Sequence, residues 1–359
     1  MKKAIIKSFL LIIYINTSLG LFAQKNEPPF LLFLNHPWVD SVMKSLTMEQ
    51  KIAQCIWIAG YSNKNVSHEV EITDLIRNYG IGGIVFFQGT PEKQAELTNY
   101  YQGISKVPLL ISMDAEWGLG MRLDNVEKFP FQMTLGAIND DSLIFRMGES
   151  VAKQMKRMGV HVNLAPVADI NSNPLNPVIN YRSFGEIKEN VTSKSIMYMK
   201  GMQSNGVLAC VKHFPGHGDT QTDSHLDLPV ITHSRARLES IEMFPFLNLI
   251  NSGAGCIMTA HLNLPSLDSR SGLPSTLSRV IINSLLKTEM NFRGLVITDA
   301  MNMKGVTKYY ENGIAEAKAL AAGNDVVEFV TDVNATIRET MKLIELKEIS
   351  KADIDNKCR

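Results

Sequence analysis

The sequence predicts an α/β fold, a single-domain (β/α)8 barrel of the TIM type, from three observations. Eight short apolar runs alternate along the chain with longer amphipathic segments. The runs are continuously apolar, as strands covered by helices on both faces require. Polar residues suited to chemistry follow the ends of several runs, at the face where the loops of a parallel barrel converge. The chain of 359 residues, 45% hydrophobic, is long enough for such a domain.

The expected strands are each bounded by Gly, Pro or polar residues. They are 52–58, 83–87, 108–113, 160–165, 207–212, 255–260, 295–298 and 325–329. The helix-like segments between them are 91–105, 140–158, 186–205, 234–252, 277–290 and 314–322. An open doubly wound sheet is the alternative, but it more often carries a Gly-rich turn after its first strand, and this chain has none. Segment 332–359 offers one helix and then a helix start at 350–353 that stops abruptly, so we expect a truncated last helix.

Residues 1–23 are expected to be a signal peptide. Lys2 and Lys3 precede an apolar stretch over 9–15, and small residues follow up to Ala23. The apolar stretch is short for a membrane span, which leaves an uncleaved anchor as the alternative. No cysteine follows it at a position suited to lipid attachment. We therefore expect a mature domain at 24–359 that is periplasmic or secreted, with no membrane contact after signal removal.

The charge balance favours a small, uncharged or weakly charged ligand. The formal net charge is zero and the sequence pI is about 7.1, which gives no footprint for nucleic acid or an anionic membrane. Cys55, Cys210 and Cys256 each lie in an apolar run and are expected in the core. Cys358 is expected to be unstructured. Because no pair has Cys-x-x-Cys or metal spacing, the sequence predicts neither a disulfide-dependent nor a zinc-dependent fold.

Segment 212–225, K-H-F-P-G-H-G-D-T-Q-T-D-S-H, is the most informative stretch of the chain. It places a lysine, three histidines and two aspartates among glycines and a proline. A hydrophobic core does not need this composition, because each ionisable group would need a partner. The alternative is a structural loop held by side-chain hydrogen bonds. Other polar residues that follow the runs are Asp114, Glu116, Asp169, His261 and Asp299, although Asp299 alone could merely cap the next helix.

Four motifs together resemble one enzyme family. They are 212–220, the D-S-H at 223–225, N-Y-R-S-F-G at 180–185 and T-D-A-M-N-M at 298–303. They fall in the family's order along the chain, within a similarity that covers about 37–329, and they resemble the bacterial β-N-acetylglucosaminidases of glycoside hydrolase family 3. The resemblance implies a TIM-barrel catalytic domain and a retaining hydrolase without metal or cofactor. It also implies removal of terminal non-reducing β-linked N-acetylglucosamine, with peptidoglycan fragments as the carbohydrate substrate.

The resemblance also implies catalytic roles. Asp299 would be the nucleophile that forms a covalent glycosyl-enzyme. Asp223 and His225 would form an acid/base dyad, in which the imidazolium of His225 protonates the leaving oxygen and Asp223 orients it. His225 taken alone would more simply be a solvated loop histidine. Family members that act as β-glucosidases draw a glutamate acid/base from a second domain, for which this chain has no room.

The same resemblance implies five sugar-binding residues. Asp114 would accept hydrogen bonds from sugar hydroxyls, Arg122 and Arg182 would donate to them, and Lys212 and His213 would complete the pocket floor. Taken alone, the two arginines are more often surface ion pairs.

One loop departs from the family pattern. Where the family usually has D-Q-E-G-G-R-V-Q-R, this chain has D-A-E-W-G-L-G-M-R at 114–122. Trp117 could stack on a sugar or pack beneath the loop. The activities left open are a glycosidase for another β-linked sugar and a glycoside phosphorylase. A non-catalytic glycan-binding protein is the alternative from another class, and the presence of Asp223, His225 and Asp299 together argues against it.

Overall fold

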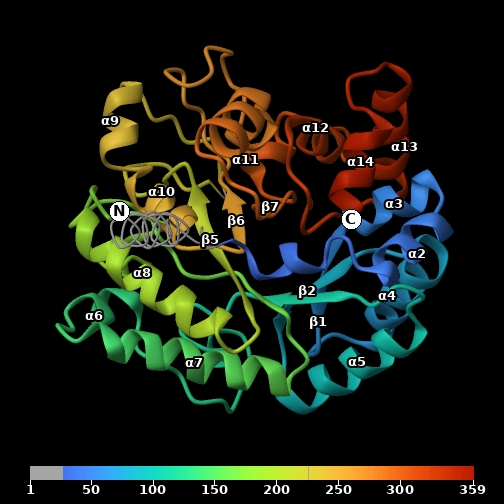
Figure 1. The fold of residues 1–359 in the computed structure, drawn as a ribbon, viewed down its shortest axis with the longest axis horizontal. Coiled ribbons are helices and arrows are strands. Elements are labelled where there is room, and N and C mark those ends of the chain that lie inside the picture. Colours follow the sequence, from blue (N-terminus) through green and yellow to red (C-terminus); the bar gives the residue numbers. More distant parts are fainter. Residues whose placement is uncertain (1–26, 225) are drawn as a thin grey trace, which may run out of the picture.

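A parallel sheet surrounded by helices forms the centre of the molecule (Figure 1). The structure is a computed structural model that describes residues 27–224 and 226–359. Seven strands of the described chain pair in sequence order, each parallel to the next. They are β1 (Trp57–Tyr61), β2 (Gly83–Gln88), β3 (Leu110–Met113), β4 (Val162–Asn163), β5 (Leu208–Phe214), β6 (Cys256–Thr259) and β7 (Leu295–Thr298). The predicted α/β class and parallel order are confirmed.

The eighth predicted strand, 325–329, is not a regular strand in the described chain. Val326 instead makes a single parallel bridge to Ile297 in β7, and Val327 makes one to Ile56 beside β1. The backbone N–H of Val327 donates to the carbonyl of Cys55 at 2.9 Å, and that of Trp57 donates to the carbonyl of Val327 at 2.9 Å. One short segment thus contacts both outer strands of the sheet.

The first predicted strand was placed too early. Ile52 and Ala53 lie in helix α3 (Met48–Gln54), and β1 begins only at Trp57. Thr47 caps α3 with a capping box, because its Oγ1 accepts from the Gln50 N–H while the Gln50 side chain accepts from the Thr47 N–H. The buried face of α3 runs directly into a buried strand. Hydrophobicity alone does not separate two such neighbours.

Helices occupy the predicted segments, with one break. Segment 234–252 forms two helices, because Pro245 fits the first turn of a helix but not its interior. The other expected segments are helical within a few residues. The α-helices besides α3 are α2 (Pro37–Ser45), α4 (Val66–Tyr79), α5 (Pro91–Ile104), α6 (Gln132–Gly136), α7 (Asp141–Arg157), α8 (Lys188–Gln203), α9 (Arg235–Ser240), α10 (Phe244–Asn251), α11 (Lys304–Thr307), α12 (Ile314–Ala322), α13 (Val333–Glu345) and α14 (Lys351–Cys358). The described chain also has 3-10 helices at η1 (Pro29–Phe33), η2 (Leu119–Met121), η3 (Asn180–Arg182) and η4 (Ser275–Leu277), and a π-helix at η5 (Val280–Glu289).

The C-terminal segment is ordered against the start of the domain. Ser350 caps α14, which packs beside α3, and the Lys51 Nζ lies 2.7 Å from Asp355 Oδ1. Cys358 is a half-buried residue of α14, so the prediction that it is unstructured was wrong. Cys55, Cys210 and Cys256 are buried free thiols, as the core assignment predicted.

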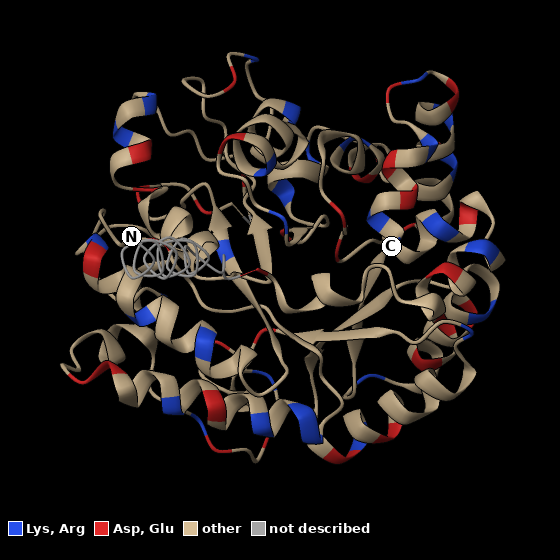
Figure 2. Ribbon diagram, in the orientation of Figure 1, with Lys and Arg blue, Asp and Glu red and all other residues tan. Residues whose placement is uncertain are grey.

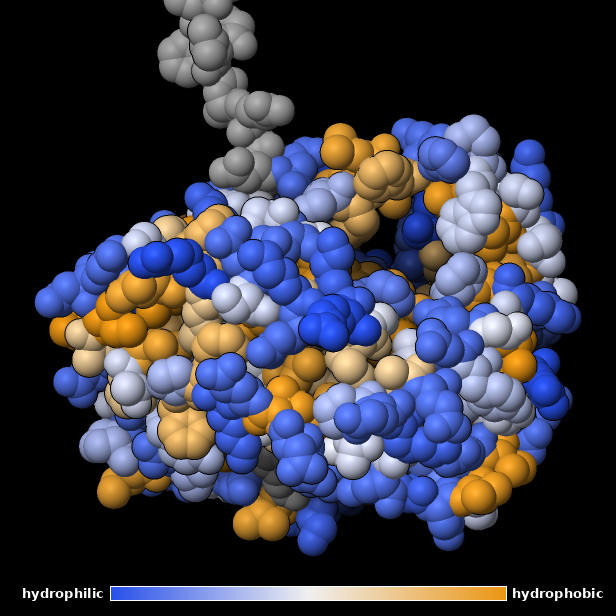
Figure 3. Space-filling view, turned by 90° about the horizontal axis from the view of Figure 1, so that it is seen from below, coloured by the Kyte–Doolittle hydropathy of each residue, from blue (hydrophilic) through white to orange (hydrophobic). Residues whose placement is uncertain are grey.

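Acidic and basic residues are interspersed along the helices that surround the sheet (Figure 2). Hydrophilic and hydrophobic residues are also mixed on the face shown in Figure 3, where a hollow opens at the upper right. None of the helices in the described chain is both long and apolar enough to cross a membrane. The predicted signal peptide lies outside the described residues. A cavity of about 1440 Å³ lies at the amino ends of the strands, lined among others by Trp57, Leu110, Leu208 and Leu295.

Candidate functional site

Ionisable side chains gather at the opposite, carboxyl ends of the strands. Asp114 follows the last residue of β3, and Lys212 lies near the end of β5. The two oxygens of Asp114 have different partners: Oδ1 accepts from Lys212 Nζ at 2.6 Å and Oδ2 from Arg122 Nη2 at 2.6 Å. Burial raises the pKa of Asp114, but Lys212 and Arg122 outweigh it and hold this pKa well below its usual range. Three predicted sugar-binding residues are therefore in one cluster.

Glu116 joins this cluster, although the sequence did not single it out as a binding residue. Its buried carboxylate accepts from Arg182 Nη2 at 2.7 Å and Nε at 3.1 Å, and its Oε1 lies 2.9 Å from Lys212 Nζ. Burial raises the pKa of Glu116, but Arg182 and Lys212 lower it to about 2. The sequence feature that could have identified Glu116 is its position two residues after Asp114, just beyond a buried strand. Glu116 therefore pairs with both Arg182 and Lys212 and holds these two cationic side chains inside the site.

Asp169 orients His213, the fifth predicted sugar-binding residue. Nδ1 of His213 lies 2.6 Å from Asp169 Oδ2, and the carboxylate also accepts from the backbone N–H groups of His213 and His217. Burial raises the pKa of Asp169, but His213 and the hydrogen bonds lower it, so the group is ionised at neutral pH. An ionised partner places the proton on Nδ1 of His213. Nε2 then lies on the side of Arg182, 3.5 Å from its Nη2.

The second histidine of the 212–225 segment has a structural role. His217 is buried, with Nε2 3.0 Å from Ser224 Oγ and Nδ1 3.0 Å from Thr220 Oγ1. Burial lowers its pKa to about 4, so the ring is neutral at pH 7. Gly218 permits the close turn, because a Cβ there would lie 1.7 Å from the carbonyl oxygen of Ile170. Part of the stretch that the sequence marked as functional thus shapes the loop.

The loop that carries the predicted acid/base lies next to the loop after β7. The backbone carbonyl of Ser224 accepts from the Gly305 N–H at 3.3 Å. Asp223 is half-buried, and its backbone carbonyl accepts from the Leu226 and Asp227 N–H groups. His225 lies outside the described residues. The structure therefore places the residues on either side of His225 but not its side chain.

Asp299 directly follows β7 at the same end of the sheet. Its N–H donates to the carbonyl of Thr259 at 2.9 Å, and its Oδ1 accepts from the Ala300 N–H at 2.8 Å. Burial raises the pKa of Asp299, whereas nearby His213 and His261 lower it below the usual value. The carboxylate is therefore ionised at neutral pH, as a nucleophile must be.

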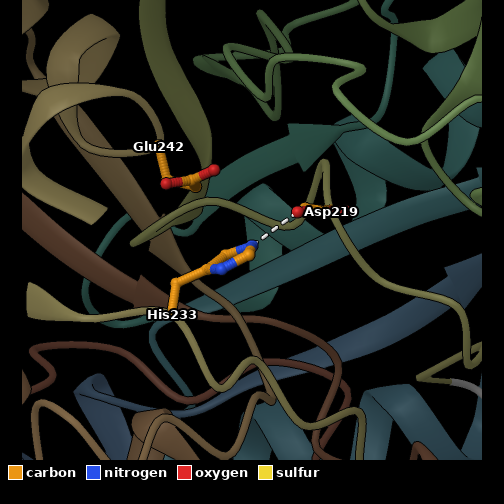
Figure 4. Close-up of side chains that lie close together, drawn as sticks. All are labelled: Asp219, His233 and Glu242. Atoms are coloured by element: carbon orange, nitrogen blue, oxygen red, sulfur yellow. Dashed lines mark hydrogen bonds and ion pairs between the residues drawn. The ribbon is translucent and has the colours of Figure 1, made fainter. Parts of the chain in front are cut away.

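A second Asp–His pair fixes the middle of the 212–225 segment (Figure 4). Asp219 Oδ2 lies 2.6 Å from His233 Nε2. The ligand-type atoms of Asp219, His233 and the buried Glu242 lie within 4.8 Å of one another. Glu242 already accepts from Arg237 Nη1 at 2.8 and 2.9 Å. These contacts tie the loop after β5 to the segments on either side of α9.

Trp117 lies in an aromatic cluster. Its ring packs edge-on against Phe131 with 4.8 Å between centroids and is 6.4 Å from Tyr181. Trp117 is half-buried, while Phe131 and Tyr181 are exposed. Since Tyr181 precedes Arg182, the cluster borders the predicted sugar-binding residues. The structure thus gives Trp117 aromatic packing partners.

Known proteins share both sequence and fold with this chain. Residues 47–359 match the glycosyl hydrolase family 3 N terminal domain. Beta-hexosaminidase A of Pseudoalteromonas piscicida is 35% identical over 279 residues, which are 71% of this chain and 47% of that protein. A family 3 beta-N-acetylglucosaminidase from Paenibacillus sp. str. FPU-7 is 35% identical with a TM-score of 0.81, covering 87% of this chain and 61% of that one. Beta-glucoside phosphorylase BglX is 25% identical with a TM-score of 0.84, covering 89% and 59%. The chain thus spans about half to three fifths of the length of these relatives. It belongs to glycosyl hydrolase family 3.

Proposed function

We propose that the protein is a retaining β-N-acetylhexosaminidase that removes terminal non-reducing β-linked N-acetylglucosamine. The observation that carries this proposal is the ionised Asp299 at the same sheet end as the Asp114, Lys212 and Arg182 cluster. Charged groups held in fixed positions suit the recognition of sugar hydroxyls, because charge-assisted hydrogen bonds are the stronger kind. The beta-hexosaminidase names of its relatives support the choice of sugar.

The proposed mechanism uses two displacements. Asp299 attacks the anomeric carbon while His225, as imidazolium, protonates the glycosidic oxygen, so that the aglycone leaves and a covalent glycosyl-enzyme forms. His225, now neutral, then takes a proton from water, whose oxygen displaces Asp299 at the anomeric carbon with overall retention. Asp223 orients His225. The clustered cations and carboxylates around Lys212 hold the sugar in both steps.

We also infer a closed (β/α)8 barrel and an exported protein. Barrel closure is supported by the bridges of Val326 and Val327 to the two outer strands. Export is supported by the signal-like composition of residues 1–23. An exported enzyme of this specificity would meet peptidoglycan fragments as its substrate. Intact mass of the protein purified from its host tests the cleavage, and release of N-acetylglucosamine from purified muropeptides tests the substrate.

Phosphorolysis is the second candidate reaction, and two observations favour it. The chain resembles a beta-glucoside phosphorylase in fold. A neutral imidazole also repels an anionic acceptor less than the usual carboxylate would. Varying phosphate during turnover separates the two reactions. A hydrolase releases free sugar at a rate independent of phosphate, whereas a phosphorylase releases sugar 1-phosphate at a rate that rises with it.

Trapping the covalent intermediate tests the proposed function. The protein is incubated with a 5-fluoro-β-N-acetylglucosaminide, which slows breakdown of the glycosyl-enzyme, and is then digested for mass spectrometry. We expect one added sugar on the peptide that contains Asp299 and none in Asp299→Asn. A label on another residue would refute the assignment of the nucleophile. Turnover with inversion would refute the double displacement.

A further inference from the structure

Glu328 is a buried carboxyl group that the proposed mechanism leaves unused. It lies in the segment that bridges β7 and the start of β1, and only 2% of its surface is exposed. Its Oε2 has no hydrogen-bond partner within the described residues. A buried polar atom left without a partner costs stability. Such an atom therefore calls for an explanation at this position.

The Glu328 side chain lies on the inner face of the sheet, as the burial of its neighbours Val326 and Val327 indicates. Val326 packs in the inner cluster with Cys210 and Ile297, whereas Val327 belongs to the outer core beneath the helices. Glu328 follows Val327, so its side chain returns to the face of Val326. The alternation ends at Phe329, whose φ of 55° is left-handed and which also packs in the inner cluster. Glu328 is two residues further than Val326 toward the carboxyl end, where the candidate site lies.

The surroundings of Glu328 are those of the sugar pocket. Its backbone N–H donates to Thr298 Oγ1 at 3.1 Å, and its carbonyl accepts from the Met301 N–H at 3.0 Å, so its main chain is bonded on both sides of Asp299. The ionisable groups that act on its carboxyl are Asp114, Asp299, Cys210 and Lys212. Burial and the two aspartates raise the pKa of Glu328 well above its usual range.

We propose that Glu328 is a sugar-binding residue, whose carboxyl group forms a hydrogen bond with a hydroxyl of the sugar held between Asp114 and Asp299. This inference rests on the proposed function, since it assumes that the pocket takes a sugar. A neutral carboxyl group can donate as well as accept, which none of the ionised carboxylates of the cluster can do. Glu328 would supply a proton donor beside Asp299 and would discriminate between sugars by the presence of one hydroxyl.

A cycle of enzyme variants and deoxy substrates tests the contact. The parent substrate is a 4-nitrophenyl β-N-acetylglucosaminide, and its 3-, 4- and 6-deoxy analogues each lack one hydroxyl. We expect the wild type to lose roughly 10- to 100-fold in kcat/KM on one analogue. Glu328→Leu should lose a similar factor on the parent and little more on that analogue. Equal losses by both proteins on every analogue would show that Glu328 makes no sugar contact.

Two further variants separate binding from folding. Glu328→Gln keeps the shape of the side chain and one donor, so it should retain more activity on the parent than Glu328→Leu. Glu316→Gln is the matched control: Glu316 is another buried glutamate, but its Oε2 accepts from the Gly313 N–H at 2.8 Å at the start of α12. It should show the wild-type response to every deoxy analogue. A Glu316→Gln response like that of Glu328→Leu would overturn the proposal.

Thermal stability gives an independent readout. Glu328→Leu should melt at a higher temperature than the wild type, because it removes an unpartnered buried carboxyl. A group with a raised folded pKa is neutral when folded and ionised when unfolded, so its destabilising effect grows as the pH rises above about 4.5. The gain in Tm should therefore be larger at pH 8 than at pH 5. A lower Tm at both pH values would show that Glu328 has a stabilising structural role instead.

The outcomes distinguish this inference from the proposed function. If the wild type cleaves the parent but shows no coupling between Glu328 and any hydroxyl, only the inference fails. If the folded wild type does not cleave, the same cycle is measured by calorimetric titration with the free sugars. Coupling in binding would then support the Glu328 contact and overturn only the activity. No binding of any of these sugars would overturn both.

Discussion

Lys212 links the two buried carboxylates of the site. Its Nζ lies 2.6 Å from Asp114 and 2.9 Å from Glu116, and the side chain is almost completely buried. Burial lowers the pKa of Lys212, but the two carboxylates raise it above its usual value. Three charges that are costly alone are thus stable as a set. The cluster is held together by its own ion pairs, which is the arrangement that precise recognition of a ligand requires.

Replacing Lys212 with methionine should therefore damage stability as well as binding. Lys212→Met keeps a side chain of similar length but removes the positive charge that pairs with Asp114 and Glu116. We expect the free energy of unfolding to fall by about 3–5 kcal/mol. Urea denaturation measures this cost. Lys308→Met is the control, since Lys308 pairs with Asp227 on the exposed surface, and its midpoint should stay close to the wild-type value. Equal midpoints for both variants would contradict the central place of Lys212.

The loop after β5, residues 215–234, connects the buried cluster to the predicted acid/base residues. The end of β5, which precedes the loop, binds the cluster through Lys212, the first part of the loop is held by His217 and Asn176, and Asp223 lies further along it. Asn176 Nδ2 donates to the carbonyls of His217 and Gly218 at 2.8 and 3.0 Å. The loop is thus fixed along most of the part that the structure describes.

Gly218 should not tolerate a side chain. Gly218→Ala would place a Cβ 1.7 Å from the Ile170 carbonyl oxygen, so the backbone must shift, and we expect a destabilisation of about 1–3 kcal/mol together with a loss of activity. Gly103→Ala is the control, because its Cβ would meet no atom within 4 Å and alanine favours the helix. Melting curves should show a lower Tm for the first variant and an equal or higher Tm for the second.

The Asp219–His233 pair should affect catalysis more than stability (Figure 4). Asp219→Asn weakens the contact that holds the loop to the segment before α9. We expect kcat/KM to fall several-fold for substrates with poor leaving groups, which need proton donation most, and little for 4-nitrophenyl glycosides. Asp355→Asn, which disrupts the ion pair with Lys51 at the opposite end of the sheet, provides the control. A uniform loss on all substrates would argue against a role in positioning the acid/base loop.

At the scale of the whole molecule, the sequence predicted the class of fold and most elements. Continuous apolar runs and strand-end polar residues identify a parallel sheet because burial imposes both features. The start of β1 was missed because Ile52 and Trp57 are equally buried, one in a helix and one in a strand. Residues 325–329 make only bridges, a distinction that depends on backbone geometry and not on hydrophobicity.

The sequence points to those residues of the candidate site that belong to a family motif, but it does not single out the others. The residues that the motifs predict to bind a sugar lie close together: Asp114, Arg122, Arg182, Lys212 and His213. Glu116 and Asp169 were visible only as polar residues after strands, since their pairing depends on contacts between distant segments. Glu328 was read as part of an apolar run, because a single acidic residue does not interrupt such a pattern. Its environment appears only when the segments are assembled.

The free energy of unfolding should fall at low pH, because the buried cluster stabilises the ionised form of Glu116. The folded pKa of Glu116, about 2, lies below the usual value of 4.5. The stabilisation from ionised Glu116 is therefore fully present above about pH 5 and is lost as the pH falls through the folded pKa, on the order of 3 kcal/mol in all. The difference in unfolding free energy between wild type and Glu116→Gln should shrink as the pH falls from 5 toward 2. A constant difference would contradict the paired, ionised state of Glu116.

Hydrolysis of a 4-nitrophenyl β-N-acetylglucosaminide by the wild type, Asp299→Ala and His225→Ala tests the central claim most directly. We expect the wild type to release the β-anomer of N-acetylglucosamine first, as proton NMR would show. Asp299→Ala should lose at least about 1000-fold in kcat while melting at the wild-type temperature. Azide should restore turnover to His225→Ala, because the azide anion can attack the glycosyl-enzyme without a general base. A folded wild type without activity, or a fully active Asp299→Ala, would contradict the account.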